Sequence, residues 1–192
     1  MKEYSINKDT LAVLPFGDKS IIYEKDDCFL VNQKPNKIMD DSCKYYGSSM
    51  VGRLKGTDSL IGITYKAPII IEEGGPLVFF PTSSPRLKKC AWVCLNNISK
   101  YYYDDISRKS VVKFLNEETI AFNMSYNILN NQVLKANRLE YVLRNRMKEK
   151  KEEEKTIKWC FFFFCGLICD IIYLGIGVWE IHKNLILGWK IC

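Results

Sequence analysis

The sequence predicts an α+β fold, in which a mostly antiparallel sheet body precedes a basic C-terminal helix. Between Leu11 and Asn123, short apolar or alternating runs are separated by turn-forming residues, as in antiparallel hairpins. From Ser125 the apolar residues repeat at helical spacing instead. The chain has 192 residues, 47% hydrophobic and 26% charged, which are ordinary values for one globular domain. We therefore expect one folded domain at residues 1–156 and a separate tail at 157–192.

The N-terminal part is expected to begin with three strands. Leu11 to Leu14 is a short apolar run, and Pro15 is expected to end it. Residues 20–32 alternate around an acidic turn and so predict a hairpin.

A short helix and a glycine-rich segment follow this hairpin. Pro35 interrupts the chain, and residues 38–46 suit a short helix with Asp40 or Asp41 near its N-terminus. Residues 41–56 then combine two tyrosines, three glycines and three basic residues. Glycines favour sharp turns and exposed backbone N–H groups, so this segment is interpreted as a cationic loop on a rigid surface that binds anions.

The middle of the chain predicts further strands around one basic loop. Residues 81–89, P-T-S-S-P-R-L-K-K, form a loop that two prolines stiffen and that carries three cations. The strand-like runs share short length and apolar or alternating character, and they lie at residues 61–65, 69–71, 77–80, 90–95, 99–103, 111–115 and 119–123. The last two are expected to pair as a second hairpin.

The C-terminal helix is expected from about Ser125 to Lys150, with Ser125 or Asn127 as its N-cap. Its apolar face comprises Leu129, Val133, Ala136, Leu143 and Met147. Basic residues align on a different face, which gives the helix a basic stripe.

Nine basic residues in these three regions are the candidates for binding a polyanion. They are Lys44, Arg53, Lys55, Arg86, Lys88, Lys89, Lys135, Arg138 and Arg146. The formal net charge of +6 favours nucleic acid or an anionic membrane surface as partner. Scattered surface charge is an equally weighted alternative from composition alone.

Catalytic, metal and cofactor sites are not expected. The only histidine is His182, in the tail, so the residues before it offer no histidine for acid–base or nucleophilic chemistry. The Cys90 and Cys94 spacing lacks the paired C-x-x-C of a structural zinc site, and these thiols are interpreted as core packing. The glycine-rich segment matches no nucleotide-binding fingerprint.

Several ordered motifs strongly resemble the ComK family of bacterial competence transcription factors. They are T-L-A-V-L-P at 10–15, D-D-S-C-K-Y-Y-G-S-S-M-V-G-R-L-K-G-T at 40–57, Y-K-A-P-I-I-I at 65–71, L-V-F-F-P-T-S-S-P-R at 77–86, C-A-W-V at 90–93 and S-Y-N-I-L-N-N-Q at 125–132. The resemblance covers about residues 4–146.

This resemblance implies a DNA-binding activator of competence genes and no enzyme, metal or cofactor. It implies double-stranded A/T-rich DNA as the partner, bound largely through the minor groove by a homodimer or higher homo-oligomer. RNA polymerase is a further candidate partner. Because the chain opens with no secretory signal, we expect a cytoplasmic protein with reduced thiols.

The tail departs from the family pattern. Residues 157–179 are almost wholly apolar and long enough for a transmembrane helix, which would make the chain a membrane-anchored cytoplasmic regulatory or interaction protein. The competing interpretation is a frameshifted tail, since Trp, Cys and His usage changes abruptly after residue 156. Both alternatives stay open from the sequence.

Overall fold

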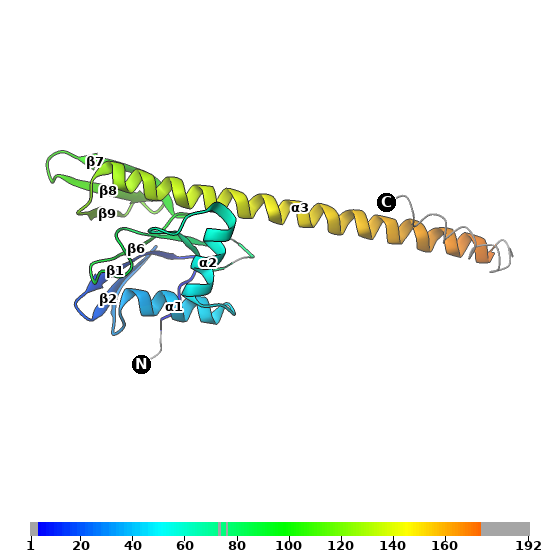
Figure 1. Cartoon of the computed structure of the whole chain (residues 1–192), viewed down its shortest axis with the longest axis horizontal. Helices are drawn as coiled ribbons and strands as arrows, with labels where there is room; N and C mark the ends of the chain where they lie inside the picture. Colours follow the sequence, from blue (N-terminus) through cyan, green and yellow to red (C-terminus); the bar gives the residue numbers. More distant parts are fainter. Residues whose placement is uncertain (1–3, 73, 76, 174–192) are drawn as a thin grey trace. The chain divides into compact units, whose positions relative to one another are not determined.

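The computed structural model describes residues 4–72, 74–75 and 77–173, and the side chains of these as far as residue 155 (Figure 1). The chain divides into two compact units, the first ending at Asn145 and the second beginning at Arg146. The described elements are helices and antiparallel strands, which confirms the α+β prediction.

A six-stranded antiparallel sheet in the order β3-β2-β1-β6-β5-β4 forms the centre of the first unit. Its strands are β1 (Thr10–Phe16), β2 (Lys19–Glu24), β3 (Cys28–Val31), β4 (Ile69–Ile70), β5 (Val78–Pro81) and β6 (Trp92–Cys94). The predicted hairpin at 20–32 is confirmed, since Ser20 pairs with Val31 across β2 and β3. Pro15 does not end β1, because the strand continues to Phe16, which pairs with Lys19 of β2.

Helix α1 (Pro35–Tyr45) begins earlier than the sequence prediction of residues 38–46. Proline fits the first helical turn because its fixed φ is already helical and its missing N–H would have no partner there. Asp40 and Asp41 therefore lie in the middle of the helix and not near its N-terminus. Asp41 accepts from Lys37 and Asp40 from Lys44, each four residues away along the helix.

Helix α2 (Met50–Ile61) occupies the second part of the glycine-rich segment, so the prediction of a loop there was wrong. The predicted strand at 61–65 was also wrong, since Ile61 ends α2 and residues 62–65 form no strand. The Ser49 hydroxyl caps its N-terminus by accepting from the Gly52 N–H at 3.0 Å. Gly62 ends the helix with a left-handed φ of 68°. These two caps outweigh the low helix propensity of the glycines inside α2.

A second, three-stranded sheet has the order β7-β8-β9. Its strands are β7 (Ile98–Asp104), β8 (Lys109–Phe114) and β9 (Thr119–Phe122). The predicted hairpin at 111–123 is confirmed by β8 and β9, in which Val112 pairs with Ile120. Helix α3 (Tyr126–Tyr173) follows, and Ser125 is its predicted cap, with its hydroxyl accepting from the Ile128 N–H at 3.4 Å.

The core of the first unit lies on both faces of the six-stranded sheet. Phe79 and Trp92 belong to a cluster beneath α1, whereas their chain neighbours Phe80 and Val93 belong to a cluster beneath the second sheet and α3 (Figure 1). This alternation follows from the two-residue period of a strand. Both faces are therefore covered, and the layers are α1 and α2, the large sheet, and the small sheet with residues 126–145 of α3.

The predicted apolar face of α3 is confirmed at Leu129, Val133 and Ala136, all buried, and Leu143 is partly buried. Leu139 is also fully buried and completes the stripe.

No helix among the described residues is long and apolar enough to cross a membrane. The structure describes no side chain of the tail at 157–192 and no residue after 173. The transmembrane alternative at 157–179 and the frameshift interpretation both concern this tail, so they lie outside what the structure describes.

Candidate nucleic-acid interface

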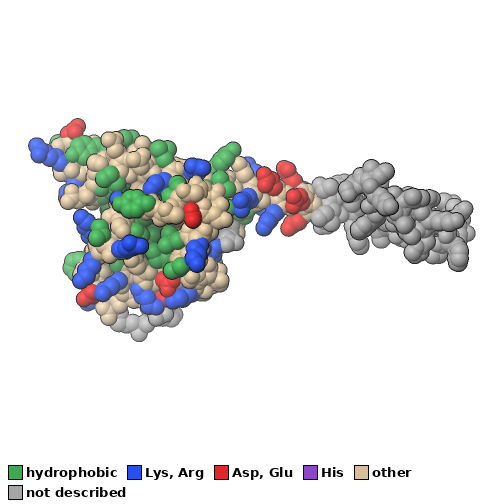
Figure 2. Space-filling view, in the orientation of Figure 1, with side chains coloured by type: hydrophobic (Ala, Val, Ile, Leu, Met, Phe, Trp, Pro, Cys, Tyr) green, Lys and Arg blue, Asp and Glu red, His purple; other side chains and the backbone are tan. Residues whose placement is uncertain are grey.

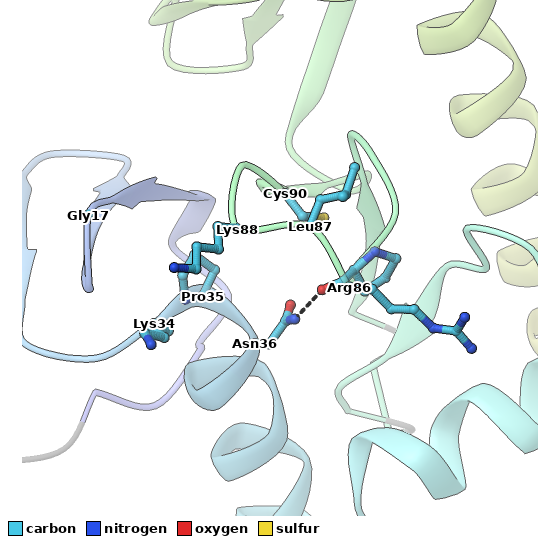
Figure 3. A pocket seen from close by; sticks show the side chains of 9 residues that line it. Gly17, Lys34, Pro35, Asn36, Arg86, Leu87, Lys88 and Cys90 are labelled. Carbon is cyan, nitrogen blue, oxygen red and sulfur yellow. Dashed lines mark hydrogen bonds between the residues drawn. The ribbon is translucent and has the colours of Figure 1, made fainter.

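The basic loop at residues 82–89 is held against α1 by Asn36. The Trp92 indole Nε1 donates to the Asn36 Oδ1 at 2.9 Å. The Asn36 Nδ2 donates in turn to the Pro85 carbonyl at 2.5 Å (Figure 3). On the other side of the loop, the Cys90 thiol donates to the Ser83 carbonyl at 3.4 Å. One amide side chain thus links a buried strand, a helix end and the loop.

Two successive turns shape the exposed end of this loop. The Leu87 N–H donates to the Ser84 carbonyl at 2.9 Å, and the Cys90 N–H donates to the Leu87 carbonyl at 3.1 Å. Arg86, Lys88 and Lys89 are all exposed between these bonds, and none of the three forms an ion pair with a described carboxylate. Backbone hydrogen bonds therefore fix the loop, while its cations remain available.

A first pocket of about 190 Å³ lies between this loop and the N-terminus of α1. Three cations line it, Lys34, Arg86 and Lys88, together with Gly17, Pro35, Asn36, Pro85, Leu87 and Cys90 (Figure 3). Asp18 forms an ion pair with Lys34 at 3.0 Å. The pKa of the Asp18 carboxyl lies below its ordinary value because Lys34 donates a hydrogen bond to it, and Lys88 adds a smaller effect. The remaining positive charge suits an oxyanion.

A second and larger pocket, of about 610 Å³, lies on the other side of the same loop. Lys66 and Lys89 line it, with Leu87, Tyr65 and the polar residues Thr82, Ser83 and Ser84. Gln132 on α3 fixes its wall, since its Nε2 donates to the Lys66 carbonyl at 3.0 Å and to the Pro81 carbonyl at 2.7 Å. The loop is therefore a ridge with a cationic pocket on each side.

Lys66 and Lys135 meet over the exposed ring of Tyr65. Their ammonium groups lie 5.3 and 5.8 Å from the ring centroid, and the Lys135 Nζ donates to the Tyr65 carbonyl at 2.9 Å. The pKa of Lys135 is lowered, first by burial and then by the charge of Lys66. Two like charges held near each other without a described ion-pair partner create a locally positive potential, which a bound anion would relieve.

The structure brings together four of the nine predicted cations. Arg86, Lys88 and Lys89 line the two pockets, and Lys135 contacts Tyr65 in the wall of the second. Sequence reasoning missed Lys34 and Lys66. Pro35 marked a helix start that would have placed Lys34 at its N-cap, whereas Lys66 has no local signal because its position depends on Gln132.

The other five predicted cations line neither pocket. Lys44 forms ion pairs with Asp40 at 2.6 Å and with Asp41 at 3.6 Å. Lys55, Arg138 and Arg146 are exposed on helices.

Arg53 is the fifth of these, and it does not lie on an exposed surface. It is only 8% exposed, and its Nη2 donates to the Tyr46 and Ile71 carbonyls at 3.4 Å each. Its guanidinium therefore joins the end of α1 to the chain beyond β4.

The cysteines of the first unit are unpaired. Cys43, Cys90 and Cys94 are buried, as packing predicts, whereas Cys28 is exposed. Burial raises the pKa of the Cys94 thiol to about 12 and that of Cys43 to about 11, so neither is an activated nucleophile. Within the described part of the chain, no cluster of three or more His, Cys, Asp or Glu side chains is arranged to hold a metal ion.

Comparison with known proteins agrees with the sequence motifs. The family model described as ComK protein matches residues 1–148. The chain is 33% identical over 154 residues to the competence transcription factor of Bacillus subtilis (strain 168), and the match covers 78% of this chain and 80% of that protein. No solved structure matches significantly. The chain therefore belongs to the ComK family.

Proposed function

We propose that the protein activates transcription of competence genes by binding A/T-rich promoter DNA, largely through the minor groove. The family membership and the similarity to a competence transcription factor support this role. Cytoplasmic location, self-association into a dimer or higher oligomer, and contact with RNA polymerase belong to the same proposal.

The observation that carries the proposal is the cationic ridge, residues 82–89, with its two flanking pockets. Arg86 and Lys88 line one pocket, and Lys89 and Lys66 line the other. Because each cation that neutralises a phosphate releases a counterion, such a cluster drives binding to nucleic acid. Figure 2 shows basic side chains spread over one face of the first unit.

The shape of the ridge favours a groove over a flat surface. A narrow, A/T-rich minor groove has an enhanced negative potential that attracts arginine and lysine. A ridge with cations on both flanks places positive charge toward both phosphate strands that border such a groove. The Asn36 hydrogen bond and the two turns already hold the ridge in the free protein. Binding therefore costs less conformational entropy than it would for a flexible loop.

The test is a titration of the 192-residue protein against A/T-rich and G/C-rich duplexes of equal length. We expect tighter binding to the A/T-rich duplex and a fall in log K with log salt between about 50 and 200 mM. The triple variant Arg86→Gln, Lys88→Gln, Lys89→Gln should bind more weakly, and its salt slope should be shallower by about 0.9 for each phosphate that the protein no longer neutralises.

The matched control is the triple variant Lys100→Gln, Arg108→Gln, Lys109→Gln, which removes the same number of positive charges. These residues are exposed on the β7–β8 hairpin and line neither ridge pocket. Their substitution should leave the slope close to that of the unmodified protein. Equal and salt-insensitive binding to both duplexes would overturn the proposed function, and equal slopes for the two triple variants would remove the ridge from the interface.

A further inference from the structure

Leu87 stands at the crest of the ridge with 48% of its surface exposed. Among the described residues it alone lines both ridge pockets, and its side chain is large and apolar. Figure 3 shows this side chain directed away from Asn36, the residue that anchors the loop. An apolar side chain thus separates the two cationic pockets.

The backbone of Leu87 is held within the loop. Its N–H donates to the Ser84 carbonyl and its carbonyl accepts from the Cys90 N–H, so both of its main-chain polar groups are used there. The loop therefore holds the leucine at one position, where 48% of its surface is exposed.

The charges around Leu87 decide which kind of partner it suits. Arg86 and Lys88 flank it in the chain, Lys89 follows Lys88, and all three are exposed. Lysines are depleted at the centre of protein–protein interfaces, where burying an unpaired ammonium is costly. Facing DNA, the same lysines would meet phosphates while the leucine meets the stacked bases between them.

We propose that Leu87 is a wedge that enters the minor groove of bound A/T-rich DNA and partly unstacks one base-pair step. The cations of the two pockets then lie beside the phosphates of the two strands. This inference rests on the proposed DNA-binding function and adds to it the residue that deforms the DNA.

The chemistry of A/T-rich DNA agrees with this arrangement. Minor-groove proteins separate base steps with apolar side chains, leucine among them. TA steps are among the most easily unstacked, so a wedge would contribute to the choice of A/T-rich sites without a hydrogen bond to any base. The rigid loop supplies the support that a wedge needs to push against the stack.

The test uses an A/T-rich duplex with 2-aminopurine at its central step, because the fluorescence of this base rises when it is unstacked. Binding of the 192-residue protein should raise the fluorescence severalfold. Leu87→Ala should abolish most of that rise and leave the salt slope of binding unchanged, since no charge is altered. Leu87→Met should restore it, because methionine keeps the length and apolar character of the side chain.

The matched control is Leu115→Ala, which truncates a leucine that is 61% exposed and lines neither ridge pocket. This variant should retain the full fluorescence rise. If Leu87→Ala fails to fold, as judged by far-ultraviolet circular dichroism, the comparison passes to Leu87→Met and Leu87→Gln, of which only the first should unstack the probe.

The outcomes separate the wedge from the DNA-binding function. If the unmodified protein shows no salt-dependent preference for A/T-rich DNA, the proposed function fails. If that preference is present but Leu87→Ala raises the probe fluorescence as much as the unmodified protein does, the wedge alone is overturned. If Leu87→Ala lowers the sedimenting mass of the protein without DNA, Leu87 is a contact between copies, and the wedge is likewise overturned.

Discussion

Arg53 shows that a cation in a basic segment can serve the fold. Its guanidinium lies within the first unit, where a buried charge needs hydrogen bonds to offset its desolvation. The carbonyls of Tyr46, at the end of α1, and of Ile71, just after β4, provide two of them. By contrast Lys55, two positions further along α2, is exposed.

We expect Arg53→Met to lower the free energy of unfolding by about 1–3 kcal/mol, because it leaves buried carbonyls without their donor. Urea denaturation followed by far-ultraviolet circular dichroism measures this change. Lys55→Met on the same helix is the control and should change stability by less than about 0.5 kcal/mol. A reduced salt slope of DNA binding in folded Arg53→Met would contradict a purely structural role and support the sequence-based assignment of Arg53 to the interface.

At the scale of elements, the stability of α2 depends more on the capping residues at its two ends than on the helix propensity of its residues. Ser49 satisfies a free N–H at the start, and Gly62 adopts the left-handed conformation at the end. Between them Gly56 has helical geometry, and a Cβ there would meet nothing within 4 Å. Gly56 and Gly62 thus have different roles, one inside the helix and one at its end.

The two glycines predict opposite effects of the same substitution. Gly56→Ala should raise the free energy of unfolding by about 0.5–1 kcal/mol, since alanine loses less backbone entropy in a helix. Gly62→Ala should lower it by about 1–2 kcal/mol, because a Cβ is strained at a φ of 68°. Urea titration of both variants checks the pair. A change of the same sign in both would contradict the helix boundaries described for α2.

At the scale of the whole molecule, the first unit contains a complete core on both faces of its large sheet. Residues 126–145 of α3 contribute Leu129, Val133, Ala136 and Leu139 to the cluster beneath the small sheet. Trp92 is the single tryptophan of this unit and is fully buried. These residues make the first unit a candidate for independent folding.

We expect a chain ending at Asn145 to fold cooperatively, with coincident urea transitions by Trp92 fluorescence and by far-ultraviolet circular dichroism. A chain ending at Asn123 is the control. It lacks the four buried α3 side chains and should show no cooperative transition, since each large one contributes about 1.5–3 kcal/mol of burial. Non-coincident transitions for the longer chain would show that residues after Asn145 are needed for the fold.

The sequence by itself determined the fold class, the hairpins, the basic loop and the family. Two-residue and helical periods are local, and so are the capping residue Ser125 and the prolines of the loop. The motifs that identified the family are likewise continuous in the chain. Where the local signal was mixed, as in the glycines of residues 41–56, the prediction of a loop was wrong because caps and packing decide whether such a segment is helical.

Only the tertiary structure decided which cations share a surface. Lys34 and Lys66 join the ridge through Asn36 and Gln132, whose hydrogen-bond partners lie far away in the chain. Arg53 leaves the surface for an equally nonlocal reason, since its Ile71 partner lies beyond α2. The charge of a residue is written in the sequence, but its exposure and its neighbours depend on contacts between distant segments, which no local pattern contains.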